Sequence, residues 1–454
     1  MSAHRVVIVG GGFGGLYAAK ALRKAPVELT LLDRRNFHLF QPLLYQVATG
    51  GLSPANIAAP LRAVLKRQRN TRVLMGEAVG FDLPGRAVLL KDGSRLPYDS
   101  LLVATGSTHH YFGHPEWEKV APSLKSVEDA TAIRRRVLFA FEAAERHGDP
   151  AERQAWLTFV IVGGGPTGVE LAGTLGEMAH STLRGNFRSI DPASARILLV
   201  EGLDRVLSTF PPKLSAKAAQ SLARLGVTVQ TGTLVTDVRP DAVTLRQGGR
   251  TEVVRTHTVL WGAGVEASPL ARALAQASGA ELDRAGRVAV RPDLTLPGHP
   301  EVFVIGDMAN YSHQTGKPLP GVAQVAMQQG RYAAETIAGR LTGRAVAPFR
   351  YRDKGMMATI GRASAVADLG WLRLSGLLAW LAWLFIHILY LIEFENRLLV
   401  LVQWASNYLT RNRSARLITG VDPMAGEGSE FGAGPGAASG GRQPPVGSPG
   451  EPAA

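Results

Sequence analysis

The chain has 454 residues and a formal net charge of +13, from 50 Lys and Arg against 37 Asp and Glu. This length corresponds to about three domains of roughly 150 residues, and a hydrophobic content of 46% excludes a fully disordered chain. Because cysteine is absent, disulfides, thiolate metal sites, iron–sulfur clusters and a catalytic thiol are excluded. Redox chemistry would need a bound organic cofactor, and we predict no metal site.

The positive charge favours anionic lipid over nucleic acid as a partner. The basic residues are scattered and form no run interleaved with exposed aromatic residues. Nucleic acid is therefore disfavoured, and the remaining interpretations are simple solubility and attraction to anionic lipid.

A glycine-rich turn lies close to the start of the chain, without a preceding signal peptide. A buried strand is predicted at Val6 to Val9, and Gly10-x-Gly12-x-x-Gly15 follows it. The three glycines permit a tight turn, a close approach of a pyrophosphate and close helix packing, and the helix N-terminus favours phosphate.

The next predicted strand, Leu29 to Leu32, ends at Asp33, where a carboxylate can accept hydrogen bonds from a ribose. We predict a dinucleotide site here. The alternative is a structural glycine turn followed by a surface aspartate.

A second turn of the same kind, Gly163-x-Gly165-x-x-Gly168, follows the apolar run Thr158 to Val162. The strand expected at Arg196 to Val200 ends in Glu201, farther along than the usual roughly 20 residues. We attribute this spacing to an extended helix and loop. Glu201 would repel a 2′-phosphate and so favours NADH over NADPH, although the nearby Arg205 weakens that preference.

Two dinucleotide sites in one chain indicate electron transfer between two cofactors. We assign FAD to the first site and NAD to the second. Without cysteine the chain cannot be a disulfide reductase, and without a Gly-Lys-Ser/Thr ending in either turn nucleotide hydrolysis has no support.

The most apolar stretch, Leu374 to Ile392, contains no formal charge. It is just long enough to span a bilayer, but a single crossing would place Arg411, Arg413 and Arg416 on the far side, against the positive-inside rule. We favour helices lying in the membrane interface, with these arginines on lipid headgroups. The alternatives are a buried core helix, a contact between two copies in a homodimer, and a true span.

These observations predict an α/β fold with two Rossmann-like dinucleotide-binding domains and a C-terminal helical membrane-association segment. The expected organisation is an FAD-binding domain at 1–117 and 291–349, an NAD(H)-binding domain at 118–290, a membrane-association region at 350–421 and a tail at 422–454. The tail is rich in Gly and Pro, and we predict that it is disordered and dispensable for activity.

Beyond the glycine turns, several motifs make the chain resemble the type II NADH dehydrogenases, which are non-pumping NADH:quinone oxidoreductases. The resemblance extends to about Gly420. It rests on Val9 to Gly15, Phe40 to Ala48, Tyr98-Asp99, Leu102 to Gly106, Val162 to Glu170, Gly306-Asp307, Ala323-Gln324 with Gln328 and Gly330, Asp353 to Gly355, and the Trp-rich C-terminal segment.

Applied to the matching positions, the resemblance implies FAD at the first turn, with Asp307 at the ribityl region, and the nicotinamide cofactor at the second. The cofactor-binding residues are expected to be Gly10, Gly12, Phe13, Gly14, Gly15, Asp33, Arg34, Ala104, Thr105, Gly106, Gly163, Gly165, Pro166, Thr167, Gly168, Glu201, Gly264, Gly306, Asp307, Ala323 and Gln324.

Three residues are candidates for catalytic roles. In the family the glutamate matching Glu170 lies beside the nicotinamide; its alternative role is to stabilise the positive end of a helix. Gln324 and Gln328 are four residues apart and share a helical face, and the resemblance implies contact of their amides with a quinone or the flavin. Lys354 is a weaker quinone candidate, and His38 is expected to be structural.

We therefore predict a peripheral or monotopic enzyme on the cytoplasmic face of the inner (plasma) membrane. It would oxidise NADH and reduce a membrane quinone, either ubiquinone or menaquinone. Proton pumping is not expected, because His387 is the one ionisable group of the His, Lys, Arg, Asp or Glu type in Leu374 to Ile392. The rival functions are a soluble-acceptor NAD(P)H-dependent reductase of the ferredoxin or rubredoxin type and a non-enzymatic redox sensor or assembly protein.

Overall fold

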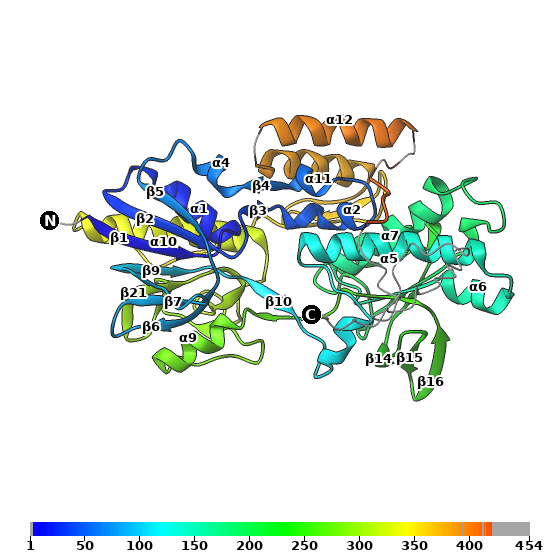
Figure 1. Cartoon of the computed structure of the whole chain (residues 1–454), viewed down its shortest axis with the longest axis horizontal. Coiled ribbons are helices and arrows are strands. Elements are labelled where there is room, and N and C mark those ends of the chain that lie inside the picture. Colours follow the sequence, from blue (N-terminus) through cyan, green and yellow to red (C-terminus); the bar gives the residue numbers. More distant parts are fainter. Residues whose placement is uncertain (1–2, 393, 411–412, 414, 420–454) are drawn as a thin grey trace, which may run out of the picture. The chain divides into compact units, whose positions relative to one another are not determined.

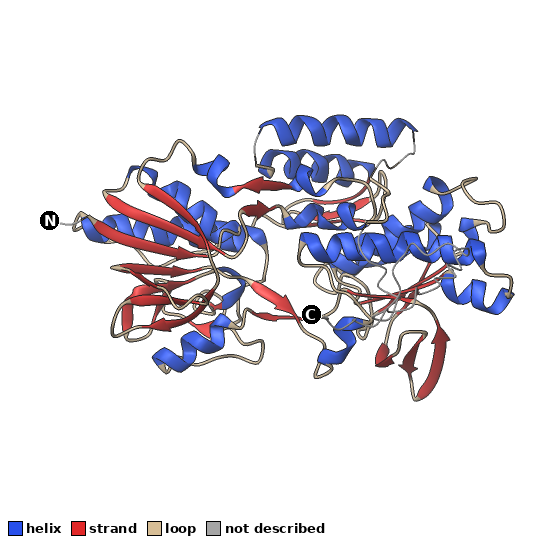
Figure 2. Cartoon of the chain, in the orientation of Figure 1, coloured by secondary structure: helices blue, strands red, loops and turns tan. Residues whose placement is uncertain are grey.

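The structure, a computed structural model, describes residues 3–392, 394–410, 413 and 415–419. The tail predicted at 422–454 lies outside the described residues. Two parallel sheets carry the two glycine turns, and helices flank their strands (Figures 1 and 2).

The first sheet has the strand order β20-β21-β9-β1-β2-β5. Its strands are β1 (His4–Val9), β2 (Val27–Asp33), β5 (Thr71–Met75), β9 (Ser100–Val103), β20 (Thr295–Leu296) and β21 (His299–Val304). All neighbours pair in parallel except β20 and β21. The central strand β1 is buried from Val6 to Val9, as expected for a parallel strand covered on both faces. Because β21 pairs with β9, a distant part of the chain completes the sheet of the first glycine turn.

Helices α1 (Phe13–Ala21) and α10 (Ala323–Leu341) lie side by side along this sheet (Figure 1). Their close approach requires Gly330, because a Cβ there would lie 2.2 Å from the Gly14 carbonyl oxygen. The turn η1 (Leu22–Lys24) ends α1. The chain after β2 forms β3 (Phe37–Leu39), η2 (Gln41–Leu43), α2 (Leu44–Ala48), α3 (Pro54–Ile57), β4 (Ala58–Pro60) and α4 (Leu61–Leu65).

The part of the chain built around the first sheet is called here the first unit, and the part built around the second glycine turn and its sheet is called the second unit. Smaller elements complete the first unit. The antiparallel strands β6 (Ala78–Asp82), β7 (Ala87–Leu90) and β8 (Arg95–Pro97) form a sheet of three, and α9 (Leu270–Ser278) packs against β6. The remaining elements are β19 (Val288–Ala289), the turn η6 (Gly306–Met308) and β22 (Ala309–Asn310).

The second sheet repeats the design with the order β13-β12-β11-β17, all parallel. Its strands are β11 (Thr158–Val162), β12 (Arg196–Val200), β13 (Val227–Gln230) and β17 (Thr258–Trp261). Its helices are α5 (Val127–Arg146), α6 (Pro150–Trp156), α7 (Pro166–Glu177) and α8 (Pro212–Arg224). An antiparallel sheet is added by β14 (Thr233–Val238), β15 (Ala242–Gln247) and β16 (Arg250–Arg255).

The extended connection expected between the second glycine turn and Glu201 is present. After α7 the chain makes a π-helical turn η4 (Met178–Thr182) and a short η5 (Pro192–Ser194) before it enters β12. A two-stranded ribbon of β10 (Ser107–His109) and β18 (Val265–Ala267), together with η3 (Pro115–Lys119), links the two sheets in the chain.

The C-terminal region begins with a sheet rather than a helix. Strands β23 (Met356–Thr359), β24 (Ala365–Asp368) and β25 (Arg373–Gly376) are antiparallel, and α11 (Leu377–Tyr390) and α12 (Phe394–Thr410) follow. The start of the apolar stretch Leu374 to Ile392 is therefore strand, because β25 pairs with β24. Among the described residues, no helix is both long and apolar enough to cross a membrane. The predicted α/β class with a helical C-terminal segment is confirmed.

Candidate functional site

The two glycine turns have nearly the same geometry. Gly10 and Gly163 have φ angles of +107° and +102°, a left-handed conformation that favours glycine. A Cβ on Gly15 would lie 1.8 Å from the Gly10 carbonyl oxygen, and a Cβ on Gly168 would lie 1.8 Å from that of Gly163. These glycines therefore allow each helix to begin directly against its own strand.

The helix N-termini at both turns are open to a ligand. Gly12 and Gly165 are the N-cap residues of α1 and α7, neither helix has a side-chain cap, and a Cβ on either glycine would meet nothing within 4 Å. Free N–H groups at a helix N-terminus attract phosphate. Each turn thus offers the cradle that a pyrophosphate requires.

An acidic residue holds each turn in the same way. Gly11 N donates to Asp33 Oδ2 at 2.5 Å, and Arg35 N donates to Asp33 Oδ1 at 2.7 Å. In the second unit, Glu201 accepts from Gly164 N at 2.5 Å and from Leu203 N at 2.8 Å. A carboxylate can accept about four hydrogen bonds, so each acid retains acceptor capacity for a ribose hydroxyl.

A cavity of about 1230 Å³, called here the first cavity, extends from the first glycine turn to the C-terminal helix α11. The predicted residues that line it are Gly10, Gly12, Phe13, Gly14, Asp33, Arg34, Ala104, Thr105, Gly106, Pro166, Thr167, Glu170, Gly306, Asp307, Ala323 and Gln324. Together with the open turn at Gly12, this lining fits a flavin dinucleotide in size and in chemistry.

A second cavity of about 140 Å³ adjoins residues of both units. Gly264 lines it together with Thr167 and Glu170. Five of the predicted residues line neither cavity: Gly15, Gly163, Gly165, Gly168 and Glu201. The glycines belong to the two backbone turns, and the Glu201 carboxylate holds the second turn.

Glu170 lies in the first part of α7 and lines both cavities. Burial raises its pKa to about 8, opposed by a 3.4 Å hydrogen bond from Thr359 N to Oε1. At neutral pH the carboxyl is therefore mostly protonated.

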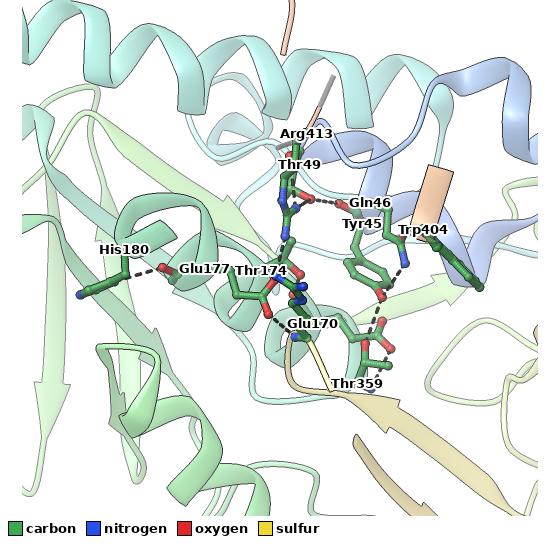
Figure 3. A network of polar contacts seen from close by, with 12 residues as sticks. Tyr45, Gln46, Thr49, Glu170, Thr174, Glu177, His180, Thr359, Trp404 and Arg413 are labelled. Atoms are coloured by element: carbon green, nitrogen blue, oxygen red, sulfur yellow. Dashed lines mark hydrogen bonds and ion pairs between the residues drawn. The ribbon is translucent and has the colours of Figure 1, made fainter. Parts of the chain in front are cut away.

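A chain of hydrogen bonds connects α12 with the surroundings of Glu170 (Figure 3). Trp404 Nε1 donates to Gln46 Oε1 at 2.7 Å, and Gln46 Nε2 donates to the Tyr45 hydroxyl at 3.0 Å. The Tyr45 hydroxyl shares a 3.0 Å hydrogen bond with Thr359 Oγ1, and burial raises the pKa of Tyr45. Residues far apart in sequence are therefore linked to Thr359, whose backbone N–H donates to Glu170.

Arg413 makes a second connection to the same region. It donates to Thr49 Oγ1 at 3.0 Å and to Glu177 Oε2 at 2.8 Å (Figure 3). The expectation that Arg413 lies on lipid headgroups is wrong, because its guanidinium is used inside the protein. Arg416 donates from Nε to the Arg413 carbonyl oxygen, and Arg411 lies outside the described residues.

The two candidate glutamines occupy different environments although both are on α10. Gln324 lines the first cavity. Gln328 lines neither cavity. Its Nε2 donates to the Arg352 carbonyl oxygen at 2.9 Å, and the Arg352 backbone N–H donates to the Gln328 Oε1 at 3.0 Å. Gln324 is therefore the one of the two glutamines that lines a cavity, whereas the Gln328 amide holds the backbone of Arg352.

The end of the first cavity near α11 contains further polar groups. Lys354 Nζ donates to the Tyr390 hydroxyl at 3.3 Å, and both residues line the cavity with His387. Burial lowers the pKa of His387 to about 4, so this imidazole is neutral. His38 is likewise neutral, with a pKa of about 4, and hydrogen-bonds the Gly11 carbonyl oxygen through Nδ1, which agrees with its expected structural role.

Sequence reasoning missed three residues that shape the site. Gln329 accepts from Gly306 N at 2.6 Å and so holds the turn that presents Asp307. Ser107 donates to Asp307 Oδ2 at 2.6 Å, and Lys125 Nζ donates to Ser107 Oγ at 3.0 Å. Their partners are distant in sequence, so no local pattern marks them.

Two dinucleotide-binding sheets, their glycine turns and the shared cavity define a nucleotide-dependent flavoprotein oxidoreductase. The family model described as pyridine nucleotide-disulphide oxidoreductase matches residues 4–330, and the NDH2 C-terminal domain matches residues 354–413.

The chain belongs to the type II NADH:quinone oxidoreductases, FAD-dependent enzymes that transfer electrons from NADH to quinone. It is 48% identical to the type II NADH:quinone oxidoreductase Ndh of Mycobacterium tuberculosis, over 93% of this chain and 92% of that protein. It is 47% identical to NdhA of the same organism, over 92% of this chain and 89% of that protein.

Solved structures agree in fold. NDH2 from Plasmodium falciparum, solved with NADH, has a TM-score of 0.82 at 20% identity and covers 92% of this chain and all (100%) of its own. A ferredoxin reductase from Rhodopseudomonas palustris has a TM-score of 0.63 and covers 80% of this chain and 81% of its own. With the NDH2 C-terminal domain also matched, the soluble-acceptor alternative is not favoured.

Proposed function

We propose that this enzyme binds FAD in the first cavity, NADH on the second glycine turn, and quinone at the α11 end of the first cavity. FAD bound there would accept two electrons from NADH and release them to quinone. The main support for this proposal is that a single cavity extends from the turn at Gly12 to His387 and Tyr390 of α11.

The residues of the first turn would hold the dinucleotide. Backbone N–H groups at the start of α1 would bind the pyrophosphate, Asp33 would accept from a ribose hydroxyl, and Asp307 would face the ribityl region. Asp307 is oriented for this by Ser107 and by the turn that Gln329 holds.

The residues of the second turn would select NADH. Glu201 is fixed by Gly164 N and Leu203 N, so its charge lies at the turn, where a 2′-phosphate would be repelled. Arg205 does not cancel this charge, because its guanidinium bonds Asp204 and the Ser208 carbonyl oxygen.

Glu170 would hold the proton that accompanies quinone reduction. With a pKa of about 8, its carboxyl keeps a proton at neutral pH and can release it without a large cost. It lines both cavities, so it faces the region where the two substrates would meet.

Gln324, Lys354 and Tyr390 would bind and orient the quinone. All three line the first cavity, and between them they offer an amide, an ammonium and a hydroxyl to a carbonyl oxygen. Ubiquinone and menaquinone both present such carbonyl oxygens.

The helices α11 and α12 would attach the enzyme to the membrane as a peripheral or monotopic protein. Leu378 and Phe385 of α11 are 66% and 63% exposed, and Val402 of α12 is 61% exposed. Further exposed apolar residues on these helices are Leu377, Leu381, Leu389, Leu398, Leu399 and Leu401. Such an apolar surface fits the membrane interface, and the net positive charge fits the anionic cytoplasmic leaflet.

Two rapid-mixing experiments test this function. Purified FAD-loaded protein is mixed anaerobically with NADH, and we expect the flavin absorbance to bleach; a quinone added next should restore it. A protein that retains no FAD, or whose flavin is not bleached by NADH, would contradict the proposal. Bleaching without reoxidation by quinone would favour the soluble-acceptor function instead.

Membrane attachment is tested separately by sedimentation with liposomes. Binding should be stronger to vesicles with anionic lipid than to neutral vesicles, and Phe385→Ser should weaken binding to both. Equal recovery of this variant and the unchanged protein with vesicles would contradict the assignment of α11 as a lipid-facing helix.

A further inference from the structure

Lys125 is a half-buried cation that lines both cavities. It precedes the N-cap residue of α5, and its backbone N–H donates to Asp129 Oδ2 at 3.0 Å. Its Nζ donates to Ser107 Oγ at 3.0 Å, and Ser107 in turn donates to Asp307 Oδ2 at 2.6 Å. The Ser107 hydroxyl therefore lies between the Lys125 ammonium and the Asp307 carboxylate.

The position of Lys125 is shared by few residues. The side chains that line both cavities are Gln41, His109, Lys125, Thr167, Glu170 and Val265. Apart from His109, Lys125 is the basic residue in this set and Glu170 is the acidic one. Glu170 is mostly protonated, and therefore neutral, at neutral pH. Of these two residues, Lys125 is thus the one that carries a charge.

Burial lowers the pKa of Lys125, and the negative charge of Asp307 opposes that effect. The backbone bond to Asp129 and the side-chain bond to Ser107 restrict the lysine to one arrangement. A buried ammonium that is hydrogen-bonded by a neutral hydroxyl exerts a stronger electrostatic effect on its surroundings than one paired directly with a carboxylate.

The reaction brings negative charge into this region. NADH would donate a hydride, which is two electrons and one proton, and would leave as NAD⁺; bound FAD would supply a site that stores these electrons. Quinone would take up the two electrons with two protons, one from the hydride and one from solvent, to form quinol. A fixed cation that faces the site where negative charge accumulates stabilises the reduced state.

We propose that Lys125 raises the reduction potential of the bound flavin by placing a fixed positive charge at the junction of the two cavities. This inference rests on the proposed binding of FAD in the first cavity. Lys125 then acts electrostatically, and its hydrogen bond to Ser107, which is itself bonded to Asp307, holds the ammonium in place.

The test compares Lys125→Met, which removes the charge at similar volume, with Lys125→Arg, which keeps it. Lys119→Met is the matched control, because Lys119 is exposed in the same connecting segment and lines neither cavity. The measured quantity is the midpoint potential of the bound flavin, obtained anaerobically by equilibration with a reference dye of known potential.

We expect Lys125→Met to make flavin reduction at least about tenfold less favourable, which is about 30 mV for a two-electron couple. Lys125→Arg and Lys119→Met should retain the potential of the unchanged protein. Equal potentials for Lys125→Met and the unchanged protein would overturn the proposal, as would a loss in Lys125→Arg as large as that in Lys125→Met.

FAD content is measured on every variant by absorbance. If Lys125→Met retains no FAD, Lys125→Gln replaces it; if neither variant retains FAD while Lys125→Arg does, Lys125 is a binding residue and the proposal is overturned. A colourless unchanged protein would instead contradict the proposed function. An unchanged protein that NADH bleaches, with equal potentials in all variants, would contradict the role of Lys125 alone.

Discussion

Arg413 and Glu177 form an ion pair of 2.8 Å in which both side chains are largely buried, with 13% and 15% of their surfaces exposed. Glu177 is the last residue of α7, the helix that also carries Glu170, whereas Arg413 follows the C-terminal helix α12. Glu177 also accepts a hydrogen bond from the backbone N–H of Arg362. The C-terminal segment is thus fastened to the helix that positions the buried acid.

Replacing Arg413 by Met should destabilise the protein strongly. The change leaves Glu177 buried without its cation and removes the hydrogen bonds to Thr49, and the expected loss is about 3 kcal/mol of the free energy of unfolding. The measurement is urea unfolding of the FAD-loaded protein, followed by circular dichroism.

The control for this prediction is Arg5→Met. Its ion pair with Asp99 has the same length of 2.8 Å, but the two side chains are 44% and 30% exposed. Such a pair is worth less than about 1 kcal/mol. Equal losses in the two variants would show that burial of the Arg413–Glu177 pair contributes nothing.

The rate of flavin bleaching by NADH should fall as the pH rises through about 8. Glu170 is neutral below its raised pKa of about 8 and negatively charged above it. A negative charge lining both cavities opposes the arrival of a hydride. The measurement is the observed rate constant at saturating NADH between pH 6 and 9.

In Glu170→Gln the amide stays neutral throughout this range, so the fall near pH 8 should disappear. Glu152→Gln is a suitable control, because Glu152 lies on α6 and pairs with His257 and Arg255, away from both cavities. A rate profile of Glu170→Gln that keeps the same fall would assign it to another group.

The two acids at the glycine turns should have separable effects. Glu201→Ala removes the acceptor of Gly164 N, and it should raise the KM for NADH roughly tenfold, since about 1.4 kcal/mol corresponds to a factor of ten. Bound FAD should be unaffected. Asp33→Ala removes the acceptor of Gly11 N and should instead lower the FAD content.

Both quantities are measured on both variants, by steady-state kinetics and by the absorbance of the bound flavin. Loss of FAD from Glu201→Ala with retention in Asp33→Ala would reverse the assignment of the two sites.

Gln324→Ala should slow the reoxidation of the flavin by quinone more than its reduction by NADH. Gln324 lines the first cavity, whereas the amide of Gln328 is occupied by the backbone of Arg352. Gln328→Ala should therefore lower stability by about 1 kcal/mol and leave both half-reactions near their original rates.

Single-turnover absorbance measurements separate the two half-reactions. Slower reoxidation in Gln328→Ala but not in Gln324→Ala would mean that the cavity lining does not identify the quinone-binding glutamine.

The two strand–turn–helix units and the acids that hold them can be recognised in the amino-acid sequence. Gly15 packs on Gly10 five residues before it, and Asp33 ends the next strand of the same strand–turn–helix–strand unit; Gly163, Gly168 and Glu201 repeat this pattern. Local steric limits and strand periodicity are written in nearby residues. The α/β class and the family could therefore be predicted, although the antiparallel sheet β23–β25 was missed within a region expected to be helical.

Which polar residues line the cavities depends on how distant segments pack together. Gln324 and Gln328 share a helix, yet the backbone of Arg352 occupies one amide and leaves the other facing the cavity. Lys125 and Glu170 owe their perturbed pKa values to burial by distant segments, and Arg413 meets Glu177 only when the chain folds back. Desolvation and long-range hydrogen bonds depend on every element that surrounds a group, so no local stretch of sequence encodes them.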